Sequence, residues 1–399
     1  MTPVKSLTFT TLYPNAIQPR HGIFVETRLR HLVASGDVVT RVVAPVPWFP
    51  TTHQAFGRYA DLARVPPKEV RHGIEIVHPR FPLIPKVGMT VAPGLLAAAM
   101  LPVLQRVIHE GYDFDVLDAH YFYPDGVAAA WLAERLHKPL VITARGTDLN
   151  LIPQHFLPRK MIQWAAEKAG AMITVCQALK ETLIQLGVNA DKVTVLRNGV
   201  NLQLFHPINR EEMRRRLGLN HITLLSVGHL IERKGHDIAI RALTELPQTR
   251  LIIAGDGEEE GALRQLSAAL GVAERVVFLG ALPQDKLAHY YGAVDALVLA
   301  SSREGWANVL LEAMACGTPV IASNVWGTPE VVAAPEAGIL MPERTPRGLV
   351  LAFNALFANY PAHEATRLYA ERFSWDDTTT GQKELFARVA GRQAKSSMA

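Results

Sequence analysis

Residues 304–320 read Glu-Gly-Trp-Ala-Asn-Val-Leu-Leu-Glu-Ala-Met-Ala-Cys-Gly-Thr-Pro-Val. Short apolar runs stand on both sides, at 295–300 and at 320–322, and each run predicts a buried strand. Asn308 can cap a helix between them, and the Gly-Thr-Pro segment ends that helix. This order of strand, helix and strand is typical of one repeat in a parallel α/β sheet.

Two carboxylates frame the start of the predicted helix. Glu304 lies in the loop at the carboxyl end of the first strand, and Glu312 follows about a turn into the helix. Gly305 lets the backbone approach a ligand closely, and the first amides of a helix favour a phosphate. Either carboxylate could accept a hydrogen bond from a sugar hydroxyl. The alternative is an ordinary α/β crossover that carries two acidic surface residues.

The stretch resembles the E-x7-E segment of retaining glycosyltransferases of the GT-B fold, family 4. In that family the first carboxylate, here Glu304, contacts the donor sugar, and the second, here Glu312, contacts the ribose of the nucleotide. The resemblance implies a donor site that includes Glu304, Gly305, Trp306, Ala307, Asn308, Val309 and Glu312. It extends over nearly the whole chain and implies an α/β fold with two Rossmann-like domains facing each other across a cleft.

Composition limits the protein class before any motif is used. The chain has 399 residues, enough for two domains with separate cores, and its 49% apolar and 20% charged content is that of a soluble globular protein. Cys176 and Cys316 lie in apolar contexts and are expected to be buried thiols in a reducing, cytoplasmic setting. No metal-ligand cluster and no signal peptide are visible.

The two halves of the chain differ in charge. Residues 1–205 carry 21 Lys+Arg and 15 Asp+Glu, a net charge of +6, whereas residues 206–399 carry 20 and 22, a net charge of −2. The basic half can be a solvated surface, an anionic-ligand site or a weak membrane-facing patch. The apolar run 91–104, which contains two prolines, is too short to span a bilayer and is expected to be a buried helix, with a membrane-dipping helix as the alternative.

Polar residues follow predicted strands in the first half. Gly22 lies at a strand-to-helix turn, where backbone can meet a phosphate or simply turn. By the family resemblance Gly22 faces the donor diphosphate, and His120, at the end of strand 114–120, lies next to the donor sugar. The segment Pro-Arg-His-Gly-Ile-Phe-Val-Glu around Gly22 resembles the branch with teichuronic-acid biosynthesis enzymes, a bacterial group.

One position departs from the family pattern. After strand 140–144 the family usually shows His-Gly-x-Asp, whereas this chain has Arg145-Gly-Thr-Asp148. Arg145 and Asp148 are interpreted as acceptor residues, with a structural pair between them as the alternative. The long segment 45–90, rich in proline and aromatic residues, is expected to be a loop near the acceptor.

A cationic loop follows strand 222–227. Arg233 and Lys234 stand at the start of a predicted helix, where the macrodipole disfavours cations unless an anion binds there. By the resemblance, Lys234 meets the donor diphosphate, and His229 replaces the usual arginine and is at most auxiliary. Arg233 is also a candidate donor-binding residue that could carry the missing charge, but its side chain is expected to point elsewhere if the helix begins near residue 236. The resemblance also implies donor contacts at the strand ends that carry Asp256, Gly257 and Leu279.

The resemblance implies that residues 1–205 form a Rossmann-like acceptor domain and residues 206–374 a Rossmann-like donor domain. A last helix, about 375–399, is expected to pack back onto the first domain, as in the family. The resemblance implies that the catalytic residues are His120, Lys234 and Glu304.

The resemblance implies a retaining, metal-independent hexosyltransferase in exopolysaccharide biosynthesis. Its donor substrate would be a UDP- or GDP-sugar, with no further cofactor, and its acceptor a polysaccharide or lipid-linked glycan. The protein would be cytoplasmic, with peripheral contact to the inner face of the membrane and no nucleic-acid partner. A nucleotide-sugar epimerase of similar fold and a non-catalytic nucleotide-binding subunit are the alternatives.

Overall fold

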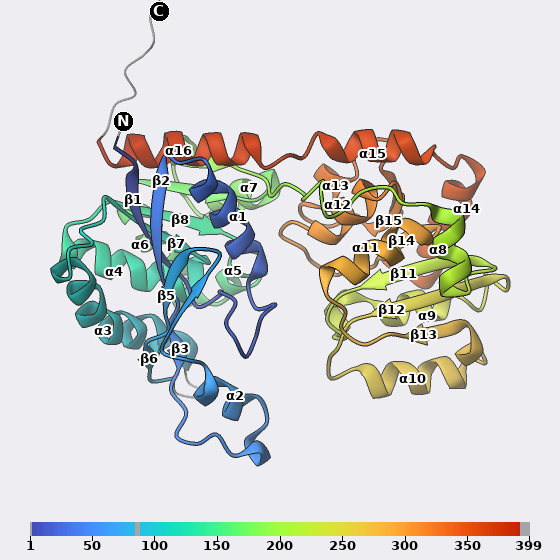
Figure 1. The fold of residues 1–399 in the computed structure, drawn as a ribbon, viewed down its shortest axis with the longest axis horizontal. Coiled ribbons are helices and arrows are strands. Elements are labelled where there is room, and N and C mark those ends of the chain that lie inside the picture. Colours follow the sequence, from blue (N-terminus) through green and yellow to red (C-terminus); the bar gives the residue numbers. More distant parts are fainter. Residues whose placement is uncertain (1, 84–87, 392–399) are drawn as a thin grey trace, which may run out of the picture. The chain divides into compact units, whose positions relative to one another are not determined.

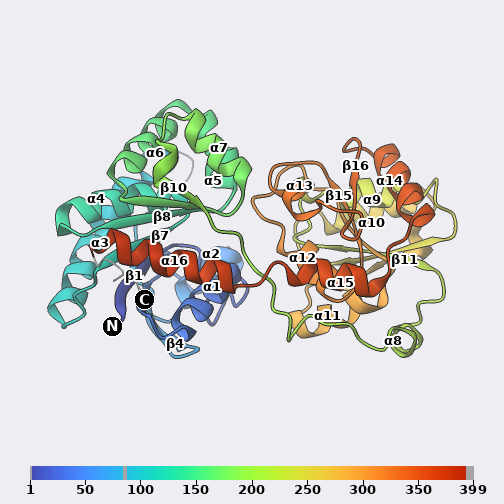
Figure 2. The ribbon, with the colours of Figure 1, turned by 90° about the horizontal axis from the view of Figure 1, so that it is seen from above.

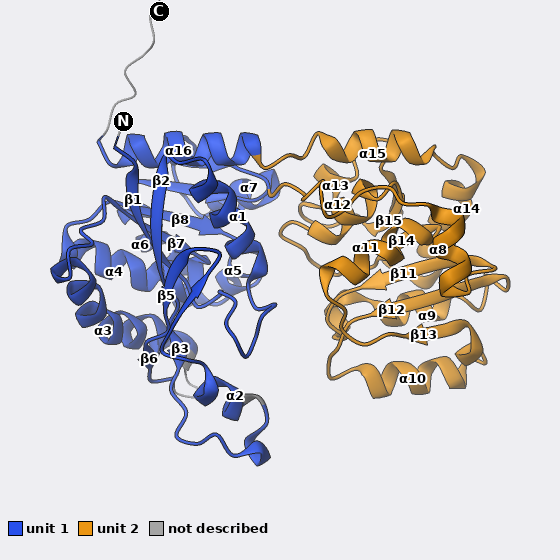
Figure 3. Ribbon diagram, in the orientation of Figure 1, with its two compact units in different colours: residues 1–197, 376–399 blue, residues 198–375 orange. Residues whose placement is uncertain are grey.

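The computed structural model describes residues 2–83 and 88–391. The chain divides into two compact units, residues 1–197 with 376–399 and residues 198–375 (Figure 3). Each unit has its own sheet covered by helices, mainly parallel in the first unit and fully parallel in the second, as Figure 1 shows. The fold is therefore α/β, with one Rossmann-like sheet in each unit.

The first unit is built on an eight-stranded sheet of order β10-β9-β8-β7-β1-β2-β5-β4, in which only β4 is antiparallel to its neighbour. Its strands are β1 (Val4–Phe9), β2 (Val38–Val43), β4 (Lys68–Arg71), β5 (Ile74–Val77), β7 (Val116–His120), β8 (Leu140–Ala144), β9 (Ala171–Thr174) and β10 (Val193–Val195), with β3 (Val46–Pro47) and β6 (Arg80–Phe81) in a small second sheet. Its helices are α1 (Ile23–Ala34), α2 (Arg58–Arg64), α3 (Gly88–His109), α4 (Val127–Leu136), α5 (Thr147–Asn150), α6 (Phe156–Lys168), α7 (Gln177–Gln185) and α16 (Asp376–Val389).

The second unit has a six-stranded, fully parallel sheet of order β13-β12-β11-β14-β15-β16. Its strands are β11 (Ile222–Val227), β12 (Thr249–Ala254), β13 (Val276–Phe278), β14 (Ala296–Leu299), β15 (Val320–Ser323) and β16 (Gly338–Met341). Its helices are α8 (Arg210–Leu217), α9 (His236–Ala242), α10 (Glu260–Ala269), α11 (Gln284–Ala293), α12 (Asn308–Ala315), α13 (Thr328–Val331), α14 (Pro346–Ala358) and α15 (His363–Glu371). This is the doubly wound strand order: successive strands are added toward one edge of the sheet from β11 to β13 and toward the other edge from β14 to β16, so the order reverses between β11 and β14.

The division between the units falls after residue 197, earlier than the sequence-based boundary after 205. Hydrogen bonds explain the difference, because they tie the segment 198–205 to the second unit. The Val200 amide donates to the Phe373 carbonyl (2.9 Å), and the Arg367 guanidinium donates to the Phe205 carbonyl (2.7 Å).

The last helix belongs to the first unit, and Figure 2 shows it in red beside α1. Leu385 and Phe386 of α16 are buried in the same core as Leu29 of α1. Gln382 Oε1 accepts a hydrogen bond from the Nε of the fully buried Arg28 (2.7 Å). The part of the expected helix beyond residue 391 lies outside the described residues.

Helix α3 is longer than its sequence suggests, because it continues through Pro93 and Pro102. In the described part of the chain, Met89–His109 is the helix that is long and apolar enough to cross a membrane by length and composition. The expectation that this apolar segment is too short was therefore wrong. Leu96 and Leu104 are fully buried against the rest of the unit, which is what a core helix of a globular domain requires.

The segment 45–90 is not the loop that its composition suggests. It contains β4 and β5, and Val42 pairs with Ile76 so that β5 extends the main sheet. The alternation of buried Ile74 and Ile76 with exposed Glu75 gives β5 one apolar face, as a half-covered strand needs. The high proline content of the segment suggested a loop, so the alternation of apolar and polar residues in β5 was not recognised as a strand.

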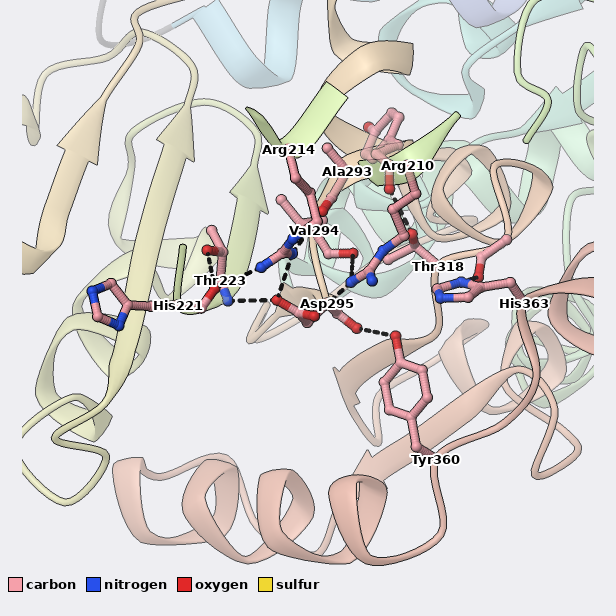
Figure 4. Close-up of polar contacts among 12 residues, drawn as sticks. Arg210, Arg214, His221, Thr223, Ala293, Val294, Asp295, Thr318, Tyr360 and His363 are labelled. Carbon is pink, nitrogen blue, oxygen red and sulfur yellow. Dashed lines mark hydrogen bonds and ion pairs between the residues drawn. The ribbon is translucent and has the colours of Figure 1, made fainter. Parts of the chain in front are cut away.

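The segment that starts the second unit is fixed by Asp295, at the amino end of β14 (Figure 4). Its carboxylate accepts hydrogen bonds from Arg210 (2.5 Å) and Arg214 (3.0 Å) of α8 and from the Thr223 amide (2.7 Å). The Tyr360 hydroxyl donates to the Asp295 carbonyl (2.7 Å). These contacts hold α8 at the amino ends of the strands, on the side of the sheet away from the carboxyl ends. We therefore infer that they stabilise the second unit and do not bind a ligand.

Candidate functional site

In the second unit the candidate site lies where the strand order reverses. Loops after β11 and β14 leave the sheet side by side there, which is where ligands of doubly wound sheets bind. The Ser302 amide donates to the Arg233 carbonyl (2.8 Å), so the two loops are joined. Gly235 has φ +68°, and a Cβ there would lie 2.2 Å from the Ala300 carbonyl oxygen. Only glycine permits this contact.

Glu304 is the centre of the charged group in this unit. Its Oε1 lies 2.6 Å from Lys234 Nζ and 3.4 Å from Arg233 Nη1. Burial raises the pKa of Glu304, but the charges of Lys234 and Arg233 outweigh it, so the net pKa is lowered. The carboxylate therefore stays ionised and holds two cations at the sheet edge.

The structure corrects the expected direction of Arg233. The sequence predicted that Arg233 points away from Lys234, but its guanidinium reaches Glu304 and also donates to the Arg303 carbonyl (2.9 Å). The reason is local: residues 232–234 form a 3₁₀ turn before α9, which begins only at His236. This tighter turn brings both neighbouring side chains to one carboxylate.

Residues 305–309 form the loop into α12. The Trp306 indole donates to the Asn198 carbonyl (3.0 Å), and the Asn198 amide lies 3.3 Å from Asn308 Oδ1. Asn308 is the first residue of the helix and Ala307 occupies the cap position, so Asn308 does not cap the helix as its type suggested. Gly305 and Val309 flank this anchored turn.

Glu312 lies within α12 and turns toward α11. It accepts a hydrogen bond from the Tyr291 hydroxyl (2.9 Å) and has Gln284 Nε2 at 3.4 Å. Burial raises the pKa of Glu312 to about 7, against these two hydrogen bonds, which lower it. Glu312 is thus a carboxyl group that can change protonation near neutral pH.

The neighbouring strand ends contribute a more exposed group. His229 Nδ1 lies 3.5 Å from Asp256 Oδ1, and both side chains are exposed. A Cβ at Gly257 would lie 2.4 Å from the Leu230 carbonyl oxygen, so the loops after β11 and β12 touch through this glycine. The Leu279 amide, directly after β13, donates a hydrogen bond to the Ile253 carbonyl oxygen (2.9 Å). The structure therefore brings His229, Asp256 and Gly257 together at this edge.

In the first unit the strand order reverses between β1 and β7. The loop after β1 ends at Gly22, whose φ is +68° and where a Cβ would lie 2.3 Å from the Leu12 carbonyl oxygen. His21 Nε2 lies 3.0 Å from the Thr11 carbonyl oxygen and closes the loop on itself. Gly22 is therefore required by a close backbone contact at this edge of the sheet.

His120, at the end of β7, is fully buried with both ring nitrogens in contact with partners. Its Nε2 lies 2.9 Å from Asp118 Oδ2, and its Nδ1 lies 2.5 Å from Arg145 Nη2. The Arg145 guanidinium can only donate, so Nδ1 accepts, and Nε2 carries the proton that Asp118 accepts. Burial lowers the pKa of His120 to about 4, so the ring is neutral at neutral pH.

Asp148 is occupied by its own loop. Its carboxylate accepts hydrogen bonds from the backbone amides of Phe122 (2.7 Å), Gly146 (2.7 Å) and Arg145 (3.1 Å). Burial raises the pKa of Asp148, and these hydrogen bonds lower it. Asp148 thus shapes the loop, whereas the Arg145 side chain reaches His120 and lies 5.3 Å from the centre of the Phe24 ring.

Several of these residues have partners that the sequence did not predict. Asp118 supports His120, Tyr291 supports Glu312, and Asn198 supports Trp306. The spacing Asp118-x-His120 was a readable signal, because residues two apart on a strand share one face. Tyr291 gave no such signal, because it lies in a different helix from Glu312.

Metal-ligand groups and cysteines were considered within residues 2–83 and 88–391, which the structure describes. In them, no group of three or more His, Cys, Asp or Glu side chains could hold a metal ion. Cys176 and Cys316 are buried free thiols, which confirms their expected state.

Comparison with known proteins first defines the class. Over 98% of this chain and 100% of the other, the structure matches sucrose-phosphate synthase from Thermosynechococcus elongatus, with a TM-score of 0.78 at 21% identity. It also matches Anabaena HepE in complex with UDP-glucose, with a TM-score of 0.70 at 21% identity over 96% and 99% of the two chains. These are glycosyltransferases of the GT-B fold, and the chain has that fold.

Sequence relatives then identify the family. The family described as "Glycosyl transferases group 1" matches residues 209–373, and "Glycosyltransferase Family 4" matches residues 22–204. A D-inositol 3-phosphate glycosyltransferase of Xylanimonas cellulosilytica is 30% identical over 85% of this chain and 88% of its own length. TuaC of Bacillus subtilis, named for teichuronic acid biosynthesis, is 29% identical over 81% and 82%. The chain belongs to this family of glycosyltransferases.

Proposed function

We propose that the protein is a retaining, metal-independent glycosyltransferase. It moves a sugar from a nucleotide diphosphate donor to a polysaccharide or lipid-linked glycan in cell-surface polysaccharide biosynthesis. The observation that carries the proposal is the ionised Glu304, held by Lys234 and Arg233 at the switch point of the second unit. The reaction would take place on the cytoplasmic side of a membrane, with peripheral contact through the basic first half.

The charges suggest how the residues act. A diphosphate that arrives at this edge would share Lys234 and Arg233 with Glu304, and the cations would stabilise the negative charge on the departing nucleotide. The start of α12 would add backbone amides to the same phosphates. Glu304 could then accept a hydrogen bond from a donor hydroxyl, and Glu312 one from the ribose.

Different relatives suggest which donor and which acceptors should be tested first. The HepE complex contains UDP-glucose, which supports a UDP-sugar as the first donor to test. TuaC is named for teichuronic acid, which supports a cell-surface polymer as acceptor. D-inositol 3-phosphate belongs in the same assay, because another relative is named for its glycosylation.

The central test measures donor consumption with and without each acceptor. A transferase consumes the donor in step with the glycosylated product, an epimerase converts the donor without acceptor, and a non-catalytic subunit only binds it. Thermal shifts with UDP, GDP and ADP identify the base, since a ligand at 100-fold its Kd stabilises by about 2.7 kcal/mol. Absence of acceptor-dependent turnover with every donor would contradict the proposal.

A pair of variants tests the two carboxylates. We expect Glu304→Gln to reduce turnover severely, because the carboxylate is lost. UDP binding should survive, because Lys234 and Arg233 are still present to bind the phosphates. We expect Glu312→Gln mainly to weaken UDP binding. Equal UDP affinity in both variants and the wild type, measured by calorimetry, would contradict this division of roles.

A further inference from the structure

The first unit exposes large apolar side chains near the carboxyl ends of its strands. Trp48 follows β3 and is 60% exposed, and Phe56 and Tyr59 are also exposed. The Phe49 ring holds these two aromatics together, since its centre lies 5.5 Å from the centre of each. The group is thus an organised aromatic surface.

Aliphatic residues extend this surface toward α3. The Trp48 amide donates to the Phe81 carbonyl (2.8 Å), which places Trp48 beside the segment that contains the exposed Leu83. Met89 and Val91, in the first turn of α3, are also exposed. The aromatic surface and the start of α3 are therefore joined through β6.

The start of α6 adds a second exposed group. Phe156 is 69% exposed and Leu157 is exposed beside it. About one and a half turns later, Met161 Sδ lies 3.8 Å from the Tyr123 hydroxyl, which donates to the Met89 carbonyl. The first turns of α3 and α6 are thus linked through Tyr123.

The charge pattern of the same segments has one sign. Residues 44–60, 76–109 and 149–166 contain no Asp and no Glu, and Asp61, which follows the first of these segments, is paired with Arg64 (3.3 Å). Arg159 and Lys160 are exposed directly after Phe156 and Leu157. Apolar side chains with cations beside them and no carboxylate suit a negatively charged, partly apolar partner.

We propose that this surface, which comprises Trp48, Phe56, Leu83, Met89, Phe156 and Leu157, docks on an anionic lipid bilayer. Trp and Tyr favour the membrane interface because their rings have an apolar body and a polar tip. Leu, Met and Phe enter the acyl region, and Arg159 and Lys160 meet the anionic headgroups. The proposal deepens the proposed function, because a lipid-linked acceptor would be presented at this surface.

Two other occupants fit less well. A symmetric dimer through this surface would place Arg159 and Lys160 of one copy near those of the other without carboxylates to balance them. A free glycan could stack on the aromatics but gains little from Leu83, Met89 and Leu157. Both occupants are separate outcomes of the experiment.

The experiment measures cosedimentation of the full chain with vesicles of phosphatidylcholine alone and of phosphatidylcholine with phosphatidylglycerol. We expect binding to the anionic vesicles that weakens at high salt, and little binding to the neutral ones. Trp48→Ser with Phe156→Ser should weaken binding by roughly tenfold or more, because two apolar anchors are lost. Arg159→Gln with Lys160→Gln should reduce the salt dependence.

A matched control comes from the second unit. Leu368 on α15 is 63% exposed, and Leu368→Ser should leave vesicle binding unchanged. A fluorescence measurement assigns the surface directly: lipids brominated on the acyl chains should quench tryptophan emission in the wild type and much less in Trp48→Phe.

Three results would overturn the proposal. The first is that the protein does not bind anionic vesicles at low salt, and the second is that Trp48→Ser/Phe156→Ser binds them as well as the wild type does. The third is that the wild type forms a dimer in solution and the same double variant dissociates it. Vesicle binding needs no turnover, so failure here leaves the proposed transferase activity intact, and failure of that activity leaves the docking surface intact.

Discussion

At the scale of single residues, Glu304 and Glu312 have opposite surroundings although one sequence motif contains both. Glu304 has two cations within 3.4 Å and a lowered pKa. Glu312 has only hydrogen-bond donors, the Tyr291 hydroxyl and the Gln284 amide, and its pKa is raised to about 7. The same residue type is thus prepared as a fixed anion at one position and as a titrating group at the other.

The cationic loop gives the first prediction. Lys234→Ala should reduce turnover by about 10²–10³-fold, the scale for loss of one preorganised electrostatic donor. Arg233→Ala should reduce it less, because Lys234 lies closer to Glu304 Oε1, although the Arg303 carbonyl loses a partner as well. His229→Arg should be tolerated because His229 is exposed. Steady-state kinetics at saturating acceptor measure all three.

The opposite ranking would reassign the site. If Arg233→Ala abolishes turnover while Lys234→Ala is nearly normal, Arg233 is the principal phosphate cation. Parallel thermal melts of both variants are the control, because Arg233 also joins the loops after β11 and β14.

The raised pKa of Glu312 predicts a pH-dependent stability difference. Between the ordinary value, 4.5, and about 7, the folded state binds more protons than the unfolded state, so this residue lowers the free energy of unfolding as pH rises. Glu312→Gln removes that loss, so the variant should gain stability relative to the wild type from pH 5 to pH 8, by at most about 1.4 kcal/mol per pH unit. Urea unfolding at both pH values measures the difference.

Tyr291→Phe is the companion variant. It removes a hydrogen bond that lowers the pKa of Glu312, so the range over which stability is lost should still begin near the ordinary value and extend to higher pH. If the difference between Glu312→Gln and the wild type is the same at pH 5 and pH 8, Glu312 does not titrate in this range.

At the scale of elements, the reversal of strand order in each sheet determines where the polar residues gather. Gly22 lies in the loop after β1 and His120 is the last residue of β7, and Gly235 and Glu304 lie in the loops after β11 and β14. In both units a glycine contacts a carbonyl oxygen that a Cβ would overlap. The two sheets thus create similar loop junctions from different sequences, and Arg145 in the first unit acts through His120 rather than at an exposed surface.

The Asp295 network gives a prediction at this scale. Asp295→Asn should lower the free energy of unfolding by about 1–3 kcal/mol, because Arg210 and Arg214 lose a largely buried charged acceptor (Figure 4). Glu245→Gln is the matched control, since its pair with Arg347 is exposed and such pairs contribute little. Denaturant melts compare the two, and equal losses would contradict the assigned role. Turnover of folded Asp295→Asn should remain near that of the wild type.

At the scale of the whole molecule, the first unit is completed by residues that follow the second unit in the chain. Helix α16 supplies Gln382 to Arg28 and Phe386 to the core of the first unit. We therefore expect the first unit to depend on α16 for its stability.

Phe386→Ala tests this dependence. The variant should destabilise the first unit by about 3–5 kcal/mol, the usual loss for a buried phenylalanine. Hydrogen exchange should increase within residues 1–197 and stay the same within 198–375. Leu368→Ser, an exposed change in α15, is the control. A uniform increase over both units would show that they unfold together.

The sequence by itself determined the fold class and the family, because hydrophobic runs and the segment 304–320 are local signals. It also marked Glu304, Lys234 and Gly22 as special positions. It could not determine the direction of Arg233, the strands within 45–90 or the division after residue 197. These features depend on contacts between residues far apart in the chain, such as Arg233 with Glu304 and Val200 with Phe373. Such contacts form only when loops and strands pack in three dimensions, and the burial that sets the pKa of Glu312 and His120 arises in the same way.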